Sequence, residues 1–249
     1  TYISNAVPAR MYASSQSWVE KNPAFEFRFY DNEQCLALIK EHFDDRTVAA
    51  YMALPKGAFR ADFWRYCCLY VNGGVYADID TVCVLPLVKL ISTQDKFIVP
   101  YGRVNQSFLF NAFICAEPGH PLLKAVVDNA IDVIENNYGN CDDYTFSAFS
   151  GMYSGGLGPI ELASKEVVSA AFSFGLVGPM GLGNAANKLL GRDKGHPFKV
   201  GRVPLQDSSL RVLRFSQRFG IRSGIKKVLE YKYDGYEEDL QESGGKKWF

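Results

Sequence analysis

Apolar and polar residues along the first half of the chain alternate between a helical and an extended period. Helical spacing over residues 9–21 ends before Asn22-Pro23, and polar and aromatic residues then alternate over 26–30 as in a strand. Asp31 is suited to cap a helix that continues to about His42. Further helices are predicted at about 46–54, 57–71 and 121–136, and further strands at 75–77, 96–100 and 108–115.

A glycine pair divides the most apolar helix from the strand that follows it. Gly73-Gly74 ends the helix over 57–71, and Val75-Tyr76-Ala77 predicts a short buried strand. Because helical and strand patterns alternate, the sequence predicts an α/β fold with a mostly parallel central sheet flanked by helices.

The C-terminal part is less regular, since Gly and Ser become more frequent from about residue 139. The predictions there are a helix at 160–171, loops over 178–224, a helix at 224–231 and a polar tail. A single domain over 1–249 is the organisation that these patterns favour.

Composition changes this picture little. The 249 residues are 47% hydrophobic and 22% charged, as in soluble globular proteins. Lys plus Arg equals Asp plus Glu at 27 each, so net charge favours neither nucleic acid nor an anionic membrane, although a local basic patch is compatible with it.

The six Cys and three His have no metal-ligand spacing, and the redox compartment stays open. No apolar run is long enough to span a membrane, but a start at Thr1 leaves room for a lost anchor or targeting segment.

Two carboxylates two residues apart are the first candidates for chemistry. Asp78 and Asp80 follow the predicted strand 75–77, and side chains at i and i+2 of an extended segment project to the same side. Ligands of open α/β sheets bind at the carboxyl ends of strands. Two carboxylates there suit Mg²⁺ or Mn²⁺ held together with substrate phosphates. Taken alone, however, an Asp-x-Asp is more often a solvated turn or a calcium-type loop.

An acidic and a basic residue share one face of the preceding helix. Asp62 and Arg65 are three residues apart and can interact. In one interpretation they form a surface ion pair of little energetic value. In the other, Arg65 faces phosphate or sugar oxygens and Asp62 fixes a sugar or ribose hydroxyl. Position alone does not separate the two.

Together these motifs form a longer pattern. The stretch over 57–86, GAFRADFWRYCCLYVNGGVYADIDTVCVLP, resembles the DxD-containing sugar-binding region of glycosyltransferase family 32, the Och1-like family. It is also similar to the catalytic domain of the large clostridial glucosylating toxins. The early Trp18…Asn22-Pro23 segment, the Asn111-Ala112-Phe113-Ile114 stretch and Gly119-His120-Pro121 extend the resemblance to roughly residues 1–170.

The resemblance implies a GT-A nucleotide-diphospho-sugar transferase fold, a donor bound through Mn²⁺ or Mg²⁺, and retention of anomeric configuration. Asp78, Asp80 and Arg65 would be the catalytic residues, with Asp80 and Asp78 on the metal. It further implies a strand missing before Thr1. On the family pattern, the donor would be bound by Tyr2, Asn111 and Trp248 together with Asp62, Arg65 and Asp78. Ser243 would be a further metal ligand.

The predicted function is transfer of a sugar from a nucleotide-sugar, GDP-mannose or a UDP-hexose, to a glycan or other hydroxyl acceptor. Two alternatives are a metal-dependent nucleotide-sugar hydrolase and an inactive carbohydrate-binding relative. The hydrolase would need a further acidic cluster, and the inactive relative would lack the Asp-x-Asp or the Asp62–Arg65 pair. No nucleic-acid partner is expected. The sequence does not decide between the Golgi lumen and the cytoplasm.

Overall fold

A computed structural model of the chain describes residues 7–54, 57–102, 105–136, 175–205, 207–216, 220–232 and 234–242. Three residues that the family resemblance singles out, Tyr2, Ser243 and Trp248, lie outside these ranges, as does the helix predicted at 160–171. Their proposed roles therefore stay predictions.

The helices of the first half form where the sequence predicts them. Asp31 caps α2 through a reciprocal pair of hydrogen bonds with Gln34, in which each side chain accepts from the other's backbone N–H. The glycine after α4 has φ 63°, and a Cβ there would lie 2.7 Å from the Pro118 ring, so Gly73 is required both by backbone conformation and by close approach. The elements are α1 (Ala9–Lys21), α2 (Asn32–His42), α3 (Asp45–Ala53), α4 (Ala58–Asn72) and α5 (Pro121–Glu135).

The described strands follow one another in a single hydrogen-bonded order, and β6 joins its two parts. The order is β1-β4-β3-β6-β7-β8-β2, with β5 paired to β6. The long β6 pairs with β3 through its middle and with β7 through its end. The strands are β1 (Gly74–Ala77), β2 (Thr81–Cys83), β3 (Phe97–Pro100), β4 (Phe113–Ala116), β5 (Gly201–Leu205), β6 (Ser208–Ser216), β7 (Gly220–Ser223) and β8 (Lys226–Tyr231).

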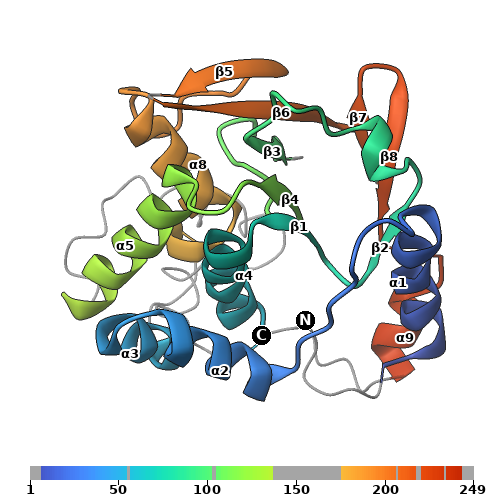
Figure 1. The fold of residues 1–249 in the computed structure, drawn as a ribbon, viewed down its shortest axis with the longest axis horizontal. Coiled ribbons are helices and arrows are strands. Elements are labelled where there is room, and N and C mark those ends of the chain that lie inside the picture. Colours follow the sequence, from blue (N-terminus) through green and yellow to red (C-terminus); the bar gives the residue numbers. More distant parts are fainter. Residues whose placement is uncertain are drawn as a thin grey trace, which may run out of the picture.

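The expectation of a mostly parallel sheet is wrong for the strands that the structure describes. Only β3 and β6 run parallel, and every other described pair is antiparallel. The physical reason lies in the connections. Parallel neighbours need a long crossover, usually a helix, whereas β3 and β4 are joined without one. The α/β class itself, a central sheet with flanking helices, is confirmed (Figure 1).

Several local predictions were also wrong. Residues 26–30 are extended but have no strand partner among the described residues, and β4 begins only at Phe113 because turns occupy the residues before it. The predicted loops over 178–224 contain α8 (Pro179–Leu189) and three strands, and the predicted helix at 224–231 is β8. The described part of the predicted polar tail, up to Glu242, contains α9 (Tyr236–Glu242).

The core is built around α4, which lies between the sheet and the helices α2 and α3 (Figure 1). Phe63 and Tyr66 on this helix have no exposed surface, and they join one cluster with residues of α2, α3, α5 and the sheet. Burial on several sides explains why α4 is hydrophobic nearly all round. It also means that the two charged residues of α4 that the cluster surrounds, Asp62 and Arg65, enter the interior.

A buried histidine makes the fold sensitive to acid. His120 is 1% exposed, packs on Phe97, and its Nδ1 accepts the Leu122 N–H that opens α5. Burial lowers the pKa of His120 to about 4 from an ordinary 6.5. The stability contribution is thus complete above pH 6.5 and is lost as the pH falls toward 4, by about 2–3 kcal/mol.

His120→Asn is the matched test, because Asn caps helices well but does not titrate in this range. We expect the unfolding free energy of the wild type to fall more steeply than that of the variant between pH 6.5 and 4. Parallel curves in urea titrations would contradict this role for His120.

Candidate functional site

The two carboxylates of the Asp-x-Asp sequence lie in the turn that joins the two halves of the sheet. β1 ends at Ala77 and β2 begins at Thr81, although these strands stand at opposite ends of the strand path. The turn is held at both sides: Asp78 N–H donates to the Ala112 carbonyl at 2.9 Å, and the Thr81 hydroxyl donates to the Asp78 carbonyl at 2.6 Å. A turn tied in this way presents its side chains in a fixed arrangement. In the described part of the sheet β1 is an end strand, and its side chains are half-buried rather than buried.

Arg65 is the centre of a buried network that connects α4 to this turn. Its Nη2 lies 2.8 Å from Asp62 Oδ1 and 3.3 Å from Asp78 Oδ1. Its Nη1 donates to the Asn111 carbonyl at 2.7 Å, and its guanidinium stacks over the Tyr76 ring. The Arg65 side chain is only 5% exposed. The interpretation of a surface ion pair is therefore excluded, and Arg65 positions both carboxylates.

Burial and neighbouring charge act together on the acidic residues. Burial raises the pKa of Asp62 to about 7, with Asp78 adding to the rise and Arg65 opposing it. Burial and the charge of Asp78 likewise raise the pKa of Asp80 to about 7. The Tyr76 hydroxyl donates to Asp78 Oδ1 at 2.7 Å. Asp80 Oδ1, in contrast, is buried and has no hydrogen-bond partner in the part of the chain that the structure describes.

These side chains line one cavity of about 340 Å³. Asp62, Arg65, Asp78 and Asp80 are all among the residues that line it. Its walls also include residues that sequence reasoning did not select, namely Tyr51, Phe110, Pro179, Tyr231 and Tyr236. The last two belong to β8 and α9, which were predicted as helix and tail. An aromatic wall beside three carboxylates suits a ligand with a polar, charged part and a flat or apolar part.

Asn111 lies at the same cavity but is committed to the protein. Its Nδ2 donates to the Tyr66 hydroxyl at 2.9 Å, and that hydroxyl donates to the Val177 carbonyl at 2.7 Å. The chain of hydrogen bonds holds α4 and the stretch before β4 against residue 177. No sequence pattern predicted this role of Tyr66, since its hydrogen-bond partner Val177 is 111 residues away.

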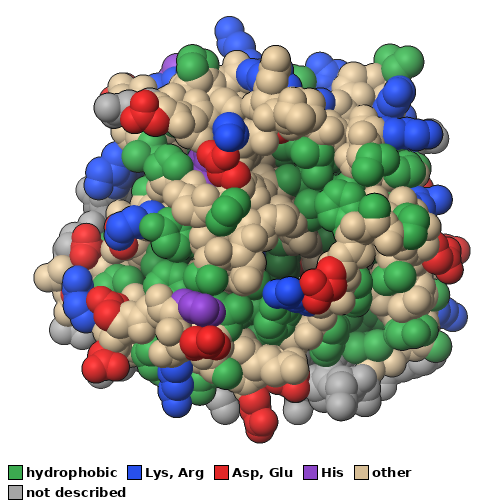
Figure 2. Space-filling model, in the orientation of Figure 1, with side chains coloured by type: hydrophobic (Ala, Val, Ile, Leu, Met, Phe, Trp, Pro, Cys, Tyr) green, Lys and Arg blue, Asp and Glu red, His purple; other side chains and the backbone are tan. Residues whose placement is uncertain are grey.

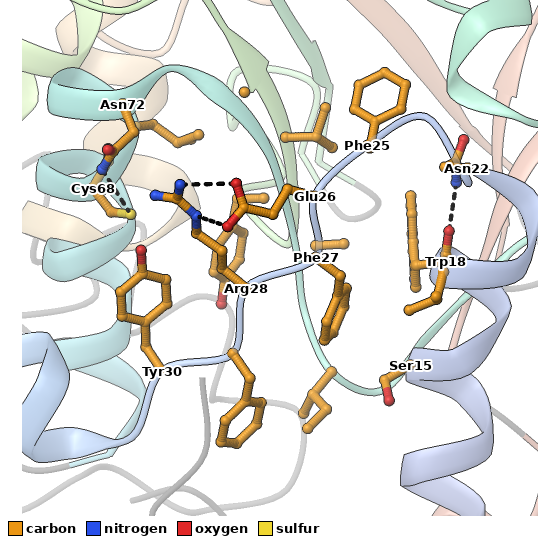
Figure 3. Close-up of a pocket in the computed structure, with 18 of the residues that line it drawn as sticks. Ser15, Trp18, Asn22, Phe25, Glu26, Phe27, Arg28, Tyr30, Cys68 and Asn72 are labelled. Atoms are coloured by element: carbon orange, nitrogen blue, oxygen red, sulfur yellow. Dashed lines mark hydrogen bonds and ion pairs between the residues drawn. The ribbon is translucent and has the colours of Figure 1, made fainter.

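A second cavity of about 390 Å³ lies against the other side of β1 (Figure 3). Tyr76, Asp78 and Ile79 line both cavities. In Figure 3, Glu26 and Arg28 face each other across a bidentate pair, with both N–O distances 2.9 Å. Trp64 also lines this cavity, and its indole Nε1 has no hydrogen-bond partner among the described residues. The carboxyl end of β1 is thus flanked by open space on two sides.

The carboxylate pair fits a hard divalent cation. No group of three or more His, Cys, Asp and Glu is placed to hold a metal within the described ranges, so a cation here would take its remaining ligands from substrate and water. That is how Mg²⁺ and Mn²⁺ bind beside phosphates. The unpartnered Oδ1 of Asp80 is an oxygen that such a cation would satisfy.

Comparisons with known proteins match this chain to a DXD-containing sugar-binding region and to glycosyltransferases. Residues 8–98 match the family described as glycosyltransferase sugar-binding region containing DXD motif. The initiation-specific alpha-1,6-mannosyltransferase of Candida albicans is 36% identical over 98 residues, which are 39% of this chain and 26% of that protein. The putative glycosyltransferase HOC1 of Saccharomyces cerevisiae is 29% identical over 150 residues, 53% of this chain and 38% of that protein. The resemblance to family 32 is thereby confirmed.

Structural similarity extends over more of the chain. The solved structure of the PaToxG glycosyltransferase aligns with 74% of this chain and 65% of its own, at 15% identity and a TM-score of 0.46. The chain spans well under half the length of the two curated relatives that it matches. Among the described residues, no helix is long and apolar enough to cross a membrane.

Proposed function

We propose that this chain, which carries a DXD-containing glycosyltransferase sugar-binding region, moves a sugar from a nucleotide-diphosphate-sugar to a hydroxyl acceptor with the help of a divalent cation. The observation that carries the proposal is the convergence of Asp78 and Asp80 on one cavity, with Asp80 Oδ1 buried and unpartnered. A carboxylate oxygen in that position is costly unless a ligand uses it. The proposal takes 1–249 as one GT-A-type domain and includes retention of anomeric configuration.

Each residue of the site has a separate task in this proposal. Asp80 and Asp78 hold Mn²⁺ or Mg²⁺ together with oxygens of the donor diphosphate. The cation supplies charge neutralisation of the departing nucleoside diphosphate. Arg65 fixes the direction of the Asp78 carboxylate through its 3.3 Å contact, and through its 2.8 Å contact it opposes the rise in the pKa of Asp62 that burial causes.

Asp62 is the residue placed to accept hydrogen bonds from donor hydroxyls. Its carboxylate lines the cavity beside Arg65, and only one of its oxygens is in contact with the guanidinium. Asn111 supports this arrangement from behind, since its side chain is bonded to Tyr66. The aromatic rings of Tyr231 and Tyr236 offer flat surfaces for a sugar or base.

The donor is proposed to be GDP-mannose, because the Candida relative is named a mannosyltransferase. UDP-hexoses are the alternatives. We expect GDP-mannose with Mn²⁺ to raise the melting temperature by roughly 5–10 °C at about 100 times the dissociation constant. Other nucleotide-sugars should give smaller shifts in the same thermal-shift screen. Absence of a shift with every nucleotide-sugar would contradict the proposed donor class.

Release of nucleoside diphosphate separates the three functions. A transferase releases it several-fold faster when a suitable acceptor is present. A hydrolase releases it at one rate whether or not an acceptor is present, and an inactive relative binds the donor without releasing it. We expect the first pattern with mannose-containing glycans as acceptors. The second or third pattern would replace the proposed function.

A further inference from the structure

The β7–β8 hairpin is a local basic region in a chain without net charge. Residues 220–231 contain Arg222, Lys226 and Lys227 against a single acidic residue, Glu230, and Arg214 lies next to them on β6, while the whole chain has 27 of each sign. The hairpin projects at one end of the molecule, away from the helices that cover the sheet (Figure 1). Local charge of one sign on a projecting element suits an anionic partner.

Cationic side chains form a row across the strands of this hairpin. Arg214 on β6 lies directly opposite Arg222 on β7, and Arg222 lies opposite Lys227 on β8. Like charges opposite each other on a sheet face destabilise it. Of these three cations, only Lys227 has an acidic partner, Glu230, among the described residues. Arg214 and Lys226 are exposed, and beyond the backbone pairing of their strands their side chains make no hydrogen bond or ion pair with any described residue.

An apolar side chain stands at the apex of the basic hairpin. Ile225 is 91% exposed, and the Arg222 Nη1 donates to its carbonyl at 3.2 Å. The segment after β2 lies beside β8, where Val84 N–H donates to the Val228 carbonyl at 3.0 Å. That segment adds two more exposed apolar residues, Val84 at 36% and Val88 at 68%. Figure 2 shows hydrophobic and basic side chains next to one another over this end of the molecule.

We propose that the hairpin apex docks this protein onto an anionic membrane surface, with Ile225 entering the headgroup region and Arg214, Arg222 and Lys226 facing acidic lipid headgroups. The combination of features selects this partner. A polyanion such as RNA would use the cations but offers no apolar phase for Ile225, whereas a bilayer interface offers both. The cavity-lining Tyr231 is six residues along β8 from Ile225, about 20 Å at the rise of a strand, so the active site would stand near the surface without touching it.

Vesicle co-sedimentation tests the docking without reference to catalysis. The purified chain is mixed with phosphatidylcholine vesicles that contain roughly a third phosphatidylserine, and with vesicles of phosphatidylcholine alone, at about 0.1 M salt. We expect binding to the anionic vesicles only, weakening as salt rises. Equal binding to both, or none to the anionic vesicles, would overturn the proposal.

Two variants separate the two parts of the surface. Arg222→Gln with Lys226→Gln should weaken vesicle binding about fivefold per charge removed. Ile225→Ser should weaken it about tenfold while leaving the salt dependence unchanged. The control, Lys40→Gln with Lys188→Gln, removes the same charge from exposed positions on α2 and α8 and should bind like the wild type.

A control pair that weakens binding as much as the hairpin pair would contradict the proposal, as would a hairpin pair that binds like the wild type. Retention on heparin that exceeds retention on vesicles, with no effect of Ile225→Ser, would assign the surface to a soluble polyanion instead. Unchanged melting temperatures for all variants are expected, because each substituted side chain is exposed.

Discussion

Asp80→Asn is expected to abolish sugar transfer and at the same time to stabilise the metal-free protein. The amide is a poor ligand for a hard dication, so the cation that offsets the leaving-group charge is lost. Several kcal/mol of such stabilisation correspond to at least roughly 10²–10³-fold in kcat. Nucleoside diphosphate release in saturating Mn²⁺ is the measurement.

The stability gain follows from the environment of the same carboxylate. Asp80 is 9% exposed, its Oδ1 has no hydrogen-bond partner among the described residues, and burial together with the charge of Asp78 raises its pKa to about 7. A neutral side chain removes both the desolvation and the repulsion. We expect the unfolding free energy of the metal-free variant at neutral pH to exceed that of the wild type by about 1–3 kcal/mol. Addition of Mn²⁺ with nucleoside diphosphate should reverse the order, since only the wild type binds it.

Asp95→Asn is the matched control for a buried carboxylate. The Asp95 side chain has no exposed surface, but it is paired with Arg202 at 2.8 Å and Arg211 at 2.7 Å. Its loss should destabilise the protein by about 2–4 kcal/mol and leave the Mn²⁺ dependence unchanged. If Asp80→Asn behaved like Asp95→Asn, or kept most of its activity in Mn²⁺, Asp80 would be a structural residue and the metal assignment would be wrong.

The contrast between Asp80 and Asp95 shows what sequence reasoning could and could not reach. Asp80 was predictable because its strand, its turn and its neighbouring Asp78 lie within eight residues of the Gly73 helix stop. The capped helices before it were predictable for the same reason, since a cap is a local hydrogen bond. The pairing of Asp95 could not be predicted from the sequence, because its partners Arg202 and Arg211 are more than 100 residues away.

Long-range pairing also explains the errors in the second half. Lys226–Tyr231 contains a short apolar run between charges, which fits a helix or a strand equally. It is a strand because β7 and β2 pair with its two edges. The aromatic wall of the cavity could not be assigned from the sequence either, since Tyr231 stands on this strand and Tyr236 on the helix α9 that follows it.

Arg65→Lys is the second substitution with a large expected effect, although it conserves charge. The guanidinium of Arg65 contacts Asp62, Asp78 and the Asn111 carbonyl at the same time. A single ammonium has no planar fork with which to reach three acceptors in fixed directions. We expect kcat/KM to fall by roughly 30–1000-fold, because a misdirected Asp78 no longer supports the metal and donor geometry.

Asp62→Asn tests the other end of the same network. Its carboxylate is proposed to accept hydrogen bonds from the donor, and loss of a charged acceptor is worth about 1.5–3 kcal/mol. The effect should therefore appear mainly as weaker donor binding, with a raised KM, whereas Arg65→Lys should lower kcat as well. Donor titrations followed by turnover measurements give both quantities.

The control for Arg65→Lys has the same substitution in an exposed pair. Arg46 forms a bidentate contact with Glu135, its Nη2 lying 2.6 Å from Oε2, and the two side chains are 59% and 43% exposed. Arg46→Lys should change stability by less than about 1 kcal/mol and leave turnover unchanged. Loss of the hydrogen-bonding geometry of a buried ion pair lowers the free energy of unfolding by about 3–5 kcal/mol at most. Arg65→Lys must therefore be assayed well below its melting temperature. Folded Arg65→Lys and Asp62→Asn variants with near-wild-type donor dissociation constants and rates would show that the network only holds α4 to the turn, and that the donor is bound elsewhere.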